Sequence, residues 1–289
     1  MGISGRITKQ AIDEAMISLV NDTQAGLALA MADKEDQDVL ADVKWHDVDA
    51  NLQMFDAIVD QNAANADLVV LPEMFTTGFS MAPEVLAEGM DGKAVAWITQ
   101  KAQSANVAIM GSAIIKENGA YYNRLLFAEP NGSLHTYDKR HLFRMGNEHN
   151  HYNGGSQRLI VSYKGWRICP LICYDLRFPV WSRNQNEYDL LIYIASWPAA
   201  RSFPWKTLLL ARAIENQCYV VGVNRVGVDG ANLTYSGDSA AIDSRGGYLS
   251  NLTPSIAGVE TVTLSMADLL DFRKKFPVML DGDRFQILD

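Results

Sequence analysis

Short apolar runs alternate along this chain with segments whose apolar residues recur at helical spacing. Runs such as Leu68–Leu71 and Leu190–Ala195 are apolar at every position, which is typical of strands buried on both faces. Asp49 can cap a helix, and one face of that helix carries Leu52, Phe55, Ile58, Val59 and Asn62. The alternation of strands and helices predicts an α/β fold.

The same pattern continues to the end of the chain. Further helices are expected at 95–105, 205–217 and 266–275. Further strands are expected at 107–115, 159–163, 168–172 and 219–224, with a hairpin over 121–137 that turns at Asn131–Gly132 and a β-like tract over 235–264. No linker rich in proline, glycine or serine divides these elements, so residues 37–289 are predicted to form one domain with two stacked sheets covered by helices.

Residues 1–36 are predicted to be a helical N-terminal extension. One helical face in this segment carries Ile12, Ala15, Met16, Leu19 and Val20. The first core strand is either Leu27–Met31 or Val39–Val43, and the apolar pattern does not choose between them.

The bulk properties of the 289 residues narrow the classes of function. A net charge of −9 argues against nucleic acid as the main partner, because neutralising phosphates needs a basic surface. No apolar run is long enough to span a bilayer, so no membrane partner is expected. Three cysteines cannot all pair within one chain, and no convincing signal peptide precedes them. The expected setting is therefore reduced and cytoplasmic.

The strand expected at 168–172 ends in Cys173, where a sharp turn would present the thiol to a pocket. The backbone N–H of Tyr174 would then point to the same place. The alternative is a cysteine that packs as a small apolar residue, since free cysteine is among the most buried residue types. Packing is the expected role of Cys169 and Cys218.

Two further reactive groups follow predicted strands. Glu73 comes just after LVVLP, and Lys139 lies in TYDKRHLF. A carboxylate can take a thiol proton and return it to a departing amine, and an ammonium can stabilise the oxyanion of a tetrahedral intermediate. Together with a thiol, these groups suit acyl transfer from a carbon–nitrogen bond. Taken singly, however, Glu73 can cap a turn and Lys139 can be one of many solvated charges.

Resemblance to a known family selects these three residues. The segments LVVLPEMFTTGF, YDKRHLF and CYDLRFPVWSRN resemble the three catalytic motifs of the nitrilase superfamily of carbon–nitrogen hydrolases. The similarity extends over roughly residues 45–289, and the motifs are most similar to the bacterial omega-amidase (2-oxoglutaramate amidase) branch. The resemblance implies a four-layer αββα sandwich and a homodimer, or a higher homo-oligomer, that packs helix layers against each other.

The resemblance also implies a role for each residue. Glu73 is expected to be the general base, Lys139 the oxyanion stabiliser and Cys173 the nucleophile, with the N–H of Tyr174 completing the oxyanion site. Glu148 matches an accessory glutamate that positions substrate and water. No redox or metal cofactor is required by this chemistry.

A metal site is the alternative reading of the loop that contains Glu148. Carboxylate and imidazole groups lie close together there, at Glu148, His149 and His151. Their spacing matches no strong metal-binding motif, and no fourth ligand is evident, so no metal is expected.

The expected substrate carries a carboxylate that needs a cationic partner. Arg201, in a loop after a strand, is the candidate for binding it bidentately. Phe79 and Trp205 are the candidate aromatic walls of the pocket. Arg177 is expected to brace the turn after the cysteine by pairing with an acidic group.

The predicted function is hydrolysis of the terminal amide of a small 2-oxo dicarboxylic acid monoamide, of the 2-oxoglutaramate or 2-oxosuccinamate type, through a cysteine thioester. Within the family, the alternative is an amidase for deaminated glutathione or N-carbamoyl compounds. From another class, the alternative is a non-catalytic binding protein on the same fold.

Overall fold

The computed structural model describes residues 24–29 and 43–287. The α-helices are α2 (Val48–Asn62), α3 (Pro83–Leu86), α4 (Lys93–Ala105), α5 (Pro179–Ser182), α6 (Ser202–Asn216) and α7 (Met266–Lys275). The strands are β1 (Gln24–Leu29), β2 (Leu68–Val70), β3 (Ala108–Glu117), β4 (Ala120–Ala128), β5 (Leu134–Asp138), β6 (Val161–Tyr163), β7 (Trp166–Ile172), β8 (Leu190–Ala195), β9 (Tyr219–Asn224), β10 (Val226–Val228), β11 (Thr234–Ser236), β12 (Ala240–Ile242) and β13 (Glu260–Ser265). Short 3₁₀ helices are η1 (Ala63–Asn65), η2 (Arg144–Gly146), η3 (Glu148–Asn150), η4 (Cys173–Arg177), η5 (Ala199–Arg201) and η6 (Val278–Asp281).

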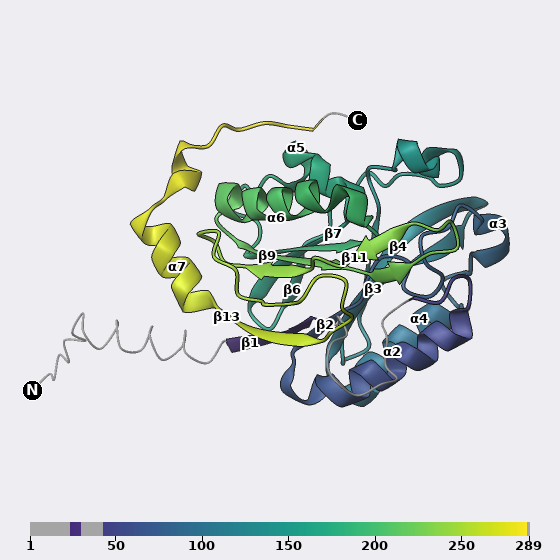
Figure 1. The fold of residues 1–289 in the computed structure, drawn as a ribbon. Coiled ribbons are helices and arrows are strands. Elements are labelled where there is room, and N and C mark those ends of the chain that lie inside the picture. Colours follow the sequence, from purple (N-terminus) through teal and green to yellow (C-terminus); the bar gives the residue numbers. More distant parts are fainter. Residues whose placement is uncertain (1–23, 30–42, 288–289) are drawn as a thin grey trace, which may run out of the picture.

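Two mixed sheets form the centre of the molecule. One has six strands in the order β13-β1-β2-β3-β4-β5, and the other has five in the order β12-β9-β8-β7-β6. Each contains three parallel strands, β1-β2-β3 and β9-β8-β7, flanked by antiparallel ones. The sheets stack face to face, with α6 above the five-stranded sheet and α2 and α4 below the six-stranded sheet (Figure 1).

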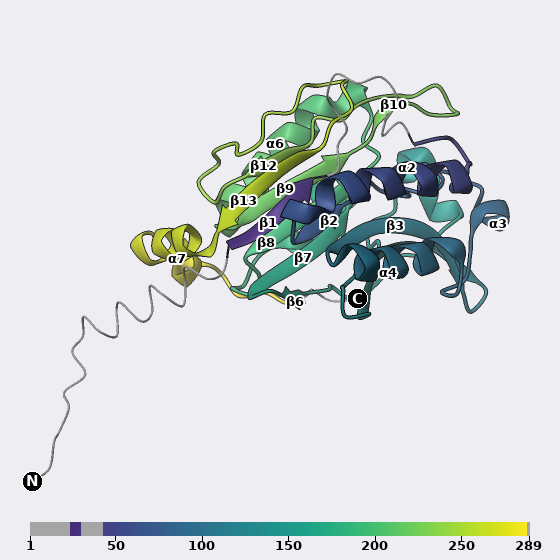
Figure 2. The same ribbon diagram turned by 90° about the horizontal axis from the view of Figure 1, so that it is seen from below.

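The burial of strand β2 shows why its sequence is apolar at every position. Leu68 and Val70 belong to the hydrophobic cluster shared with the second sheet, whereas Val69 and Leu71 belong to the cluster between this sheet and the helices α2 and α4. Successive side chains point to opposite faces of a strand, so both faces of this sheet are covered. Figure 2 shows α2 and α4 side by side across the outer face. The predicted four-layer αββα sandwich is confirmed.

The structure decides which segment is the first strand. β1 covers Gln24–Leu29, pairs parallel with β2 and pairs antiparallel with β13. The candidate Leu27–Met31 is therefore nearly right in position. Because Gln24–Leu29 lies inside the six-stranded sheet, assigning it to a helical extension was wrong. The helix expected over Ile12–Val20 lies outside the described residues.

Most other predicted elements are confirmed, with shifts at their ends. The hairpin around Asn131–Gly132 is β4 and β5, and α7 has the predicted bounds. The cap of α2 is Asp47 rather than Asp49, since the Asp47 carboxylate accepts from the Ala50 N–H at 3.0 Å. Asp49 lies in the first turn instead, where its carboxylate pairs with Lys93 at 2.6 Å.

The longest α-helices in the described part of the chain are α2 and α6. α2 and α6 have 15 residues each. Within the described residues, no helix is long and apolar enough to cross a membrane.

Candidate active site

The ends of strands from both sheets meet at one place. Glu73 follows β2 and Lys139 follows β5, both in the six-stranded sheet, whereas Cys173 follows β7 in the five-stranded sheet. The three groups therefore meet between the two sheets and not along the edge of one sheet. This arrangement places the three groups where side chains from both halves of the sandwich can touch.

Cys173 lies in a sharp turn at the end of β7. Its φ angle is +45°, a left-handed conformation that is unfavourable for a residue with a side chain. Such strain persists where surrounding contacts hold it, and it is common at functional positions. The strand gives way directly to η4, and Cys173 lines a cavity beside it. The predicted elbow is present.

Glu73 is fully buried and held by several donors. Its Oε1 accepts from Lys139 Nζ and from Asn123 Nδ2, each at 2.8 Å. Its Oε2 accepts from the Ser196 N–H at 2.8 Å, and its charge acts on the nearby Cys173 thiol. Three donors from different segments therefore hold this carboxylate near the thiol, where a base could receive its proton.

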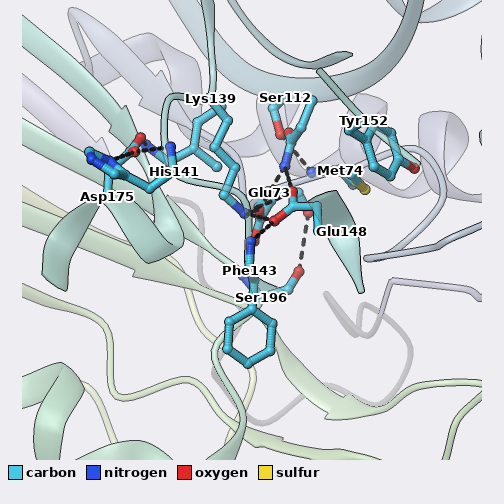
Figure 3. A network of polar contacts seen from close by, with 12 residues as sticks. Glu73, Met74, Ser112, Lys139, His141, Phe143, Glu148, Tyr152, Asp175 and Ser196 are labelled. Atoms are coloured by element: carbon cyan, nitrogen blue, oxygen red, sulfur yellow. Dashed lines mark hydrogen bonds and ion pairs between the residues drawn. The ribbon is translucent and has the colours of Figure 1, made fainter. Parts of the chain in front are cut away.

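Lys139 is fully buried between two carboxylates (Figure 3). Its Nζ donates to Glu73 Oε1 at 2.8 Å and to both oxygens of Glu148 at 3.0 and 2.9 Å. Burial acts to lower the pKa of the ammonium, but the two carboxylates outweigh it and raise that pKa above its ordinary value. The lysine is therefore a fixed positive charge at neutral pH.

Glu148, the first residue of η3, completes this cluster. It accepts from the Phe143 N–H at 2.6 Å and from Asn123 Nδ2 at 3.3 Å, besides the bonds from Lys139. Burial raises the pKa of its carboxyl group, Lys139 opposes that rise, and the nearby Glu73 carboxylate adds to it. The cluster thus holds two carboxylates against one ammonium, an arrangement that binds Lys139 tightly.

The loop around Glu148 forms no metal site in the described part of the chain. The Glu148 carboxylate is occupied by Lys139, and His151 Nδ1 lies 4.0 Å from Glu84 Oε1. Among residues 24–29 and 43–287, no three side chains of histidine, cysteine, aspartate or glutamate are placed to hold a metal ion.

The pKa of the Cys173 thiol and the backbone N–H groups at the start of η4 both bear on how this cysteine can react. Burial raises the pKa of Cys173 well above its ordinary value, the Glu73 carboxylate raises it further, and Lys139 opposes both. The resting thiol is therefore neutral at neutral pH and needs a base to become a nucleophile. Tyr174 is the second residue of η4, where backbone N–H groups have no acceptor within the helix.

A cavity of about 310 Å³ opens over Cys173. Aromatic side chains dominate its wall: Trp45, Phe79, Phe143, Tyr174, Trp197 and Tyr235. Arg177 and Arg201 also line it. Phe79 and Arg201, the candidates for substrate binding, are among its lining residues, and this volume suits a small molecule.

Trp205 is not a pocket wall, so that prediction was wrong. It is fully buried on α6, and its indole N–H donates to the Asp238 carbonyl oxygen at 2.8 Å. Its ring packs against Trp197, with ring centroids 5.4 Å apart, and Trp197 is the tryptophan that faces the cavity. The side of α6 that carries Trp205 faces the core, whereas the loop before the helix places Trp197 at the cavity.

Arg177 also differs from its predicted role. Its guanidinium lies 4.9 Å from the ring centroid of Trp197, on the cavity wall. No acidic side chain of the described residues pairs with it. The brace of the elbow is therefore another residue.

That brace is Asp175, which sequence reasoning missed (Figure 3). Its Oδ2 accepts from the Ile172 N–H at 3.1 Å and from the Tyr137 hydroxyl at 2.8 Å. Its Oδ1 accepts from the N–H and the Nδ1 of His141, at 3.0 and 2.8 Å. Residues 137 and 141 flank Lys139, so one buried carboxylate ties the elbow of Cys173 to the segment that carries the lysine.

Asn123 was missed as well. This β4 residue is fully buried, and its Nδ2 donates to both Glu73 and Glu148. The only sequence signal was an amide among the apolar residues of YYNRLLF, which also fits an ordinary strand.

The two remaining cysteines pack in the core as predicted. Cys169 and Cys218 are fully buried. Burial raises the pKa of both thiols, that of Cys169 to about 12. Neither lines the cavity, and neither has Glu73 or Lys139 acting on it as Cys173 has, so neither is placed to react.

Comparison with known proteins agrees with this site. The family model for carbon-nitrogen hydrolases matches residues 29–274. The chain is 49% identical over 243 residues to the omega-amidase YafV of Escherichia coli (strain K12), covering 84% of this chain and 94% of that protein. It is 32% identical over 245 residues to the 2-oxoglutaramate amidase of Bacillus subtilis (strain 168), covering 83% and 94%.

A solved structure extends the likeness to three dimensions. XC1258 from Xanthomonas campestris, described as a CN-hydrolase superfamily protein, is 46% identical and superposes with a TM-score of 0.86, covering 91% of this chain and 99% of that one. The family match covers most of the chain and includes the three motifs that carry Glu73, Lys139 and Cys173. The chain belongs to the carbon–nitrogen hydrolase family.

Proposed function

We propose that this protein is a thiol amidase that hydrolyses the terminal amide of a 2-oxo dicarboxylic acid monoamide, such as 2-oxoglutaramate, to the acid and ammonia. The observation that carries the proposal is the buried cluster of Glu73, Lys139 and Glu148 beside Cys173, at the base of a cavity that also carries arginines. The omega-amidase and 2-oxoglutaramate amidase names of the relatives support the same substrate class.

In the first step, Glu73 takes the proton of the Cys173 thiol as the sulfur attacks the amide carbon. A carbon–sulfur bond forms, and the carbonyl oxygen becomes an oxyanion. Lys139 Nζ donates to Glu73 and to both oxygens of Glu148, so one of the two N–H donors that face Glu148 can turn to this oxyanion. The Tyr174 N–H is the second donor.

In the second step, the intermediate collapses and the carbon–nitrogen bond breaks. Glu73 gives its proton to the departing nitrogen, and ammonia leaves a thioester on Cys173. Glu73 is again a carboxylate and takes a proton from water, whose oxygen attacks the thioester carbon. The carbon–sulfur bond then breaks, the sulfur regains the proton through Glu73, and the carboxylic acid is released.

Glu148 acts in this scheme mainly by holding Lys139. Its two oxygens both accept from Nζ, and the Phe143 N–H fixes the carboxylate in turn. This clamp keeps the ammonium at the place where the oxyanion forms, so little reorganisation is needed during reaction.

The experiment that tests the function is ammonia release from a panel of amides. Wild type is expected to hydrolyse 2-oxoglutaramate faster than deaminated glutathione, an N-carbamoyl amino acid or an aliphatic nitrile. Cys173→Ala is the control, and its rate is expected to fall by about 10⁴-fold or more. Preference for another member of the panel would replace the proposed substrate. No turnover of any member would favour a binding protein.

The raised pKa of Cys173 leads to a pH prediction. Glu73→Gln removes the charge that adds to the effect of burial, and it leaves Lys139 less opposed, so the thiol pKa should fall. The rate of alkylation by iodoacetamide, measured against pH, should therefore reach its midpoint at lower pH in this variant. Amide hydrolysis should decrease by about 10²- to 10⁴-fold, because the general base is lost.

The matched control for that measurement is Glu84→Gln, whose carboxylate lies outside the buried cluster and is largely exposed. Its alkylation profile should coincide with that of wild type. A midpoint that stays in place or rises in Glu73→Gln would contradict the assigned cause of the shift.

We propose that the protein acts in the cytoplasm as a homodimer. Apolar side chains on α5 and α6 support an interface there, since Val180 is 56%, Phe203 77% and Ile214 51% exposed. Sedimentation equilibrium should give a mass twice that of the chain, and Phe203→Asp should reduce it to that of one chain. A single-chain mass for wild type would contradict the proposal.

A further inference from the structure

Two arginine side chains face the same cavity as Cys173. The Arg177 guanidinium lies 4.9 Å from the ring centroid of Trp197, and that of Arg201 lies 5.2 Å from the ring centroid of Phe143. Stacking on an aromatic ring orients the guanidinium plane, while the N–H groups along its edge can still bind a partner in that plane. Both cations are therefore presented to whatever occupies the cavity.

The cavity wall carries one carboxylate among the described residues, and that carboxylate is occupied. Asp229 Oδ1 accepts from the N–H groups of Ala231 and Leu233 at 2.8 and 2.9 Å, and its Oδ2 accepts from the Tyr235 hydroxyl at 2.7 Å. Neither Arg177 nor Arg201 forms an ion pair with an acidic side chain within residues 24–29 and 43–287. The wall thus offers two positive charges and no free carboxylate for a cationic ligand.

We infer that Arg177 is a specificity-determining residue that acts with Arg201 on the 2-oxo acid end of the substrate, accepting 2-oxo acid monoamides and rejecting their 2-amino counterparts. This inference rests on the proposed function and extends it. A carboxylate and its neighbouring 2-oxo oxygen are acceptors only, which suits two guanidinium groups.

The same pair of charges disfavours glutamine. The 2-position of glutamine carries an ammonium group, which would lie beside two guanidinium groups without a carboxylate to receive it. Like charges placed together with no acceptor are a recognised means of excluding a wrong ligand. The distinction between the two amides therefore lies at their acid end, away from the bond that breaks.

Ratios of kcat/KM test the inference, because they cancel any general loss of active protein. The substrates are 2-oxoglutaramate, glutamine and pentanamide, a neutral amide with the same number of carbons. Arg177→Met should lower the ratio of 2-oxoglutaramate to pentanamide by about 10- to 100-fold, the range expected for losing a charge-assisted hydrogen bond. The loss should appear mainly in KM.

The charge-reversed variant should gain relative activity toward glutamine, and partial unfolding cannot produce such a gain. Arg177→Glu supplies an acceptor for the ammonium of glutamine, so the ratio of glutamine to 2-oxoglutaramate should rise by about 100-fold or more. Arg245→Met is the matched control, because this arginine also stacks on an aromatic ring, Phe272 at 4.4 Å, but lies outside the cavity. Its ratios should equal those of wild type.

A binding measurement separates recognition from chemistry. Titration calorimetry of 2-oxoglutaramate into Cys173→Ala should give a dissociation constant that rises by about 10- to 100-fold when Arg177→Met is added. Ratios and affinity unchanged within threefold, in an enzyme that does hydrolyse 2-oxoglutaramate, would overturn the inference and leave the proposed function intact. A wild type that prefers pentanamide would instead overturn the proposed function and this inference with it.

Discussion

Replacing Lys139 with methionine is expected to abolish amide hydrolysis and to lower the free energy of unfolding by about 3–5 kcal/mol. The lysine is fully buried, and its ammonium is the cation that faces both Glu73 and Glu148. Without it, two buried carboxylates face each other, and at least one must take up a proton for the fold to persist. Chemical denaturation followed by circular dichroism would measure the loss of stability, and ammonia release would measure activity.

Two further variants separate these effects. Lys93→Met removes an exposed lysine that pairs with Asp49, and it should change stability by no more than about 1 kcal/mol. Adding Glu73→Gln and Glu148→Gln to Lys139→Met removes the stranded charges, so much of the lost stability should return while activity stays absent. Failure of this triple variant to recover would show that uncompensated charge is not the cause.

Replacing Asp175 with alanine is expected to have the second largest effect. Four hydrogen bonds are lost, and donors on Tyr137, His141 and Ile172 are left near or within the core without their acceptor. The free energy of unfolding should fall by about 3–5 kcal/mol, since each unsatisfied buried donor costs about 1–3 kcal/mol and such losses do not add fully. Activity should fall as well, because the elbow and Lys139 are no longer tied together.

The measurement that isolates positioning is kinetic. In Asp175→Asn, which keeps one carbonyl acceptor, stability should recover in part, while kcat should remain lower and KM for 2-oxoglutaramate should stay close to that of wild type. Asp243→Ala is the matched control, since Asp243 also accepts two backbone N–H groups but in an exposed turn. Wild-type kcat in Asp175→Asn at the same folded fraction would contradict a positioning role.

The sequence predicted which residues form the site, but not how they are arranged in space. Glu73, Lys139 and Cys173 were recognisable because each follows a predicted strand and lies in a family motif. That they would come from two sheets was not recognisable, because a strand pattern does not say which sheet a strand joins. The contacts of Asn123 were hidden for a related reason, since a lone amide in a strand has no local signature.

The substrate side of the cavity was harder to predict than the reacting side. Arg201 and Phe79 lie where they were expected, but Trp205 faces inward and Trp197 takes its place. The two tryptophans are eight residues apart, and a loop and helix between them decide which one is exposed to the cavity. Arg177 was expected to pair with an acidic side chain, but its guanidinium lies over the ring of Trp197.

The sequence by itself determined the layered α/β fold and the chemical groups at the strand ends. A strand buried on both faces needs an apolar run, and the turn after it needs polar residues. Both patterns are local, so they can be recognised in the sequence alone. Only the tertiary structure decided that β1 is Gln24–Leu29, that Asp175 braces the elbow and that two arginines face one cavity. These depend on partners far away in sequence, because pairing, burial and charge compensation are set by what packs opposite each side chain.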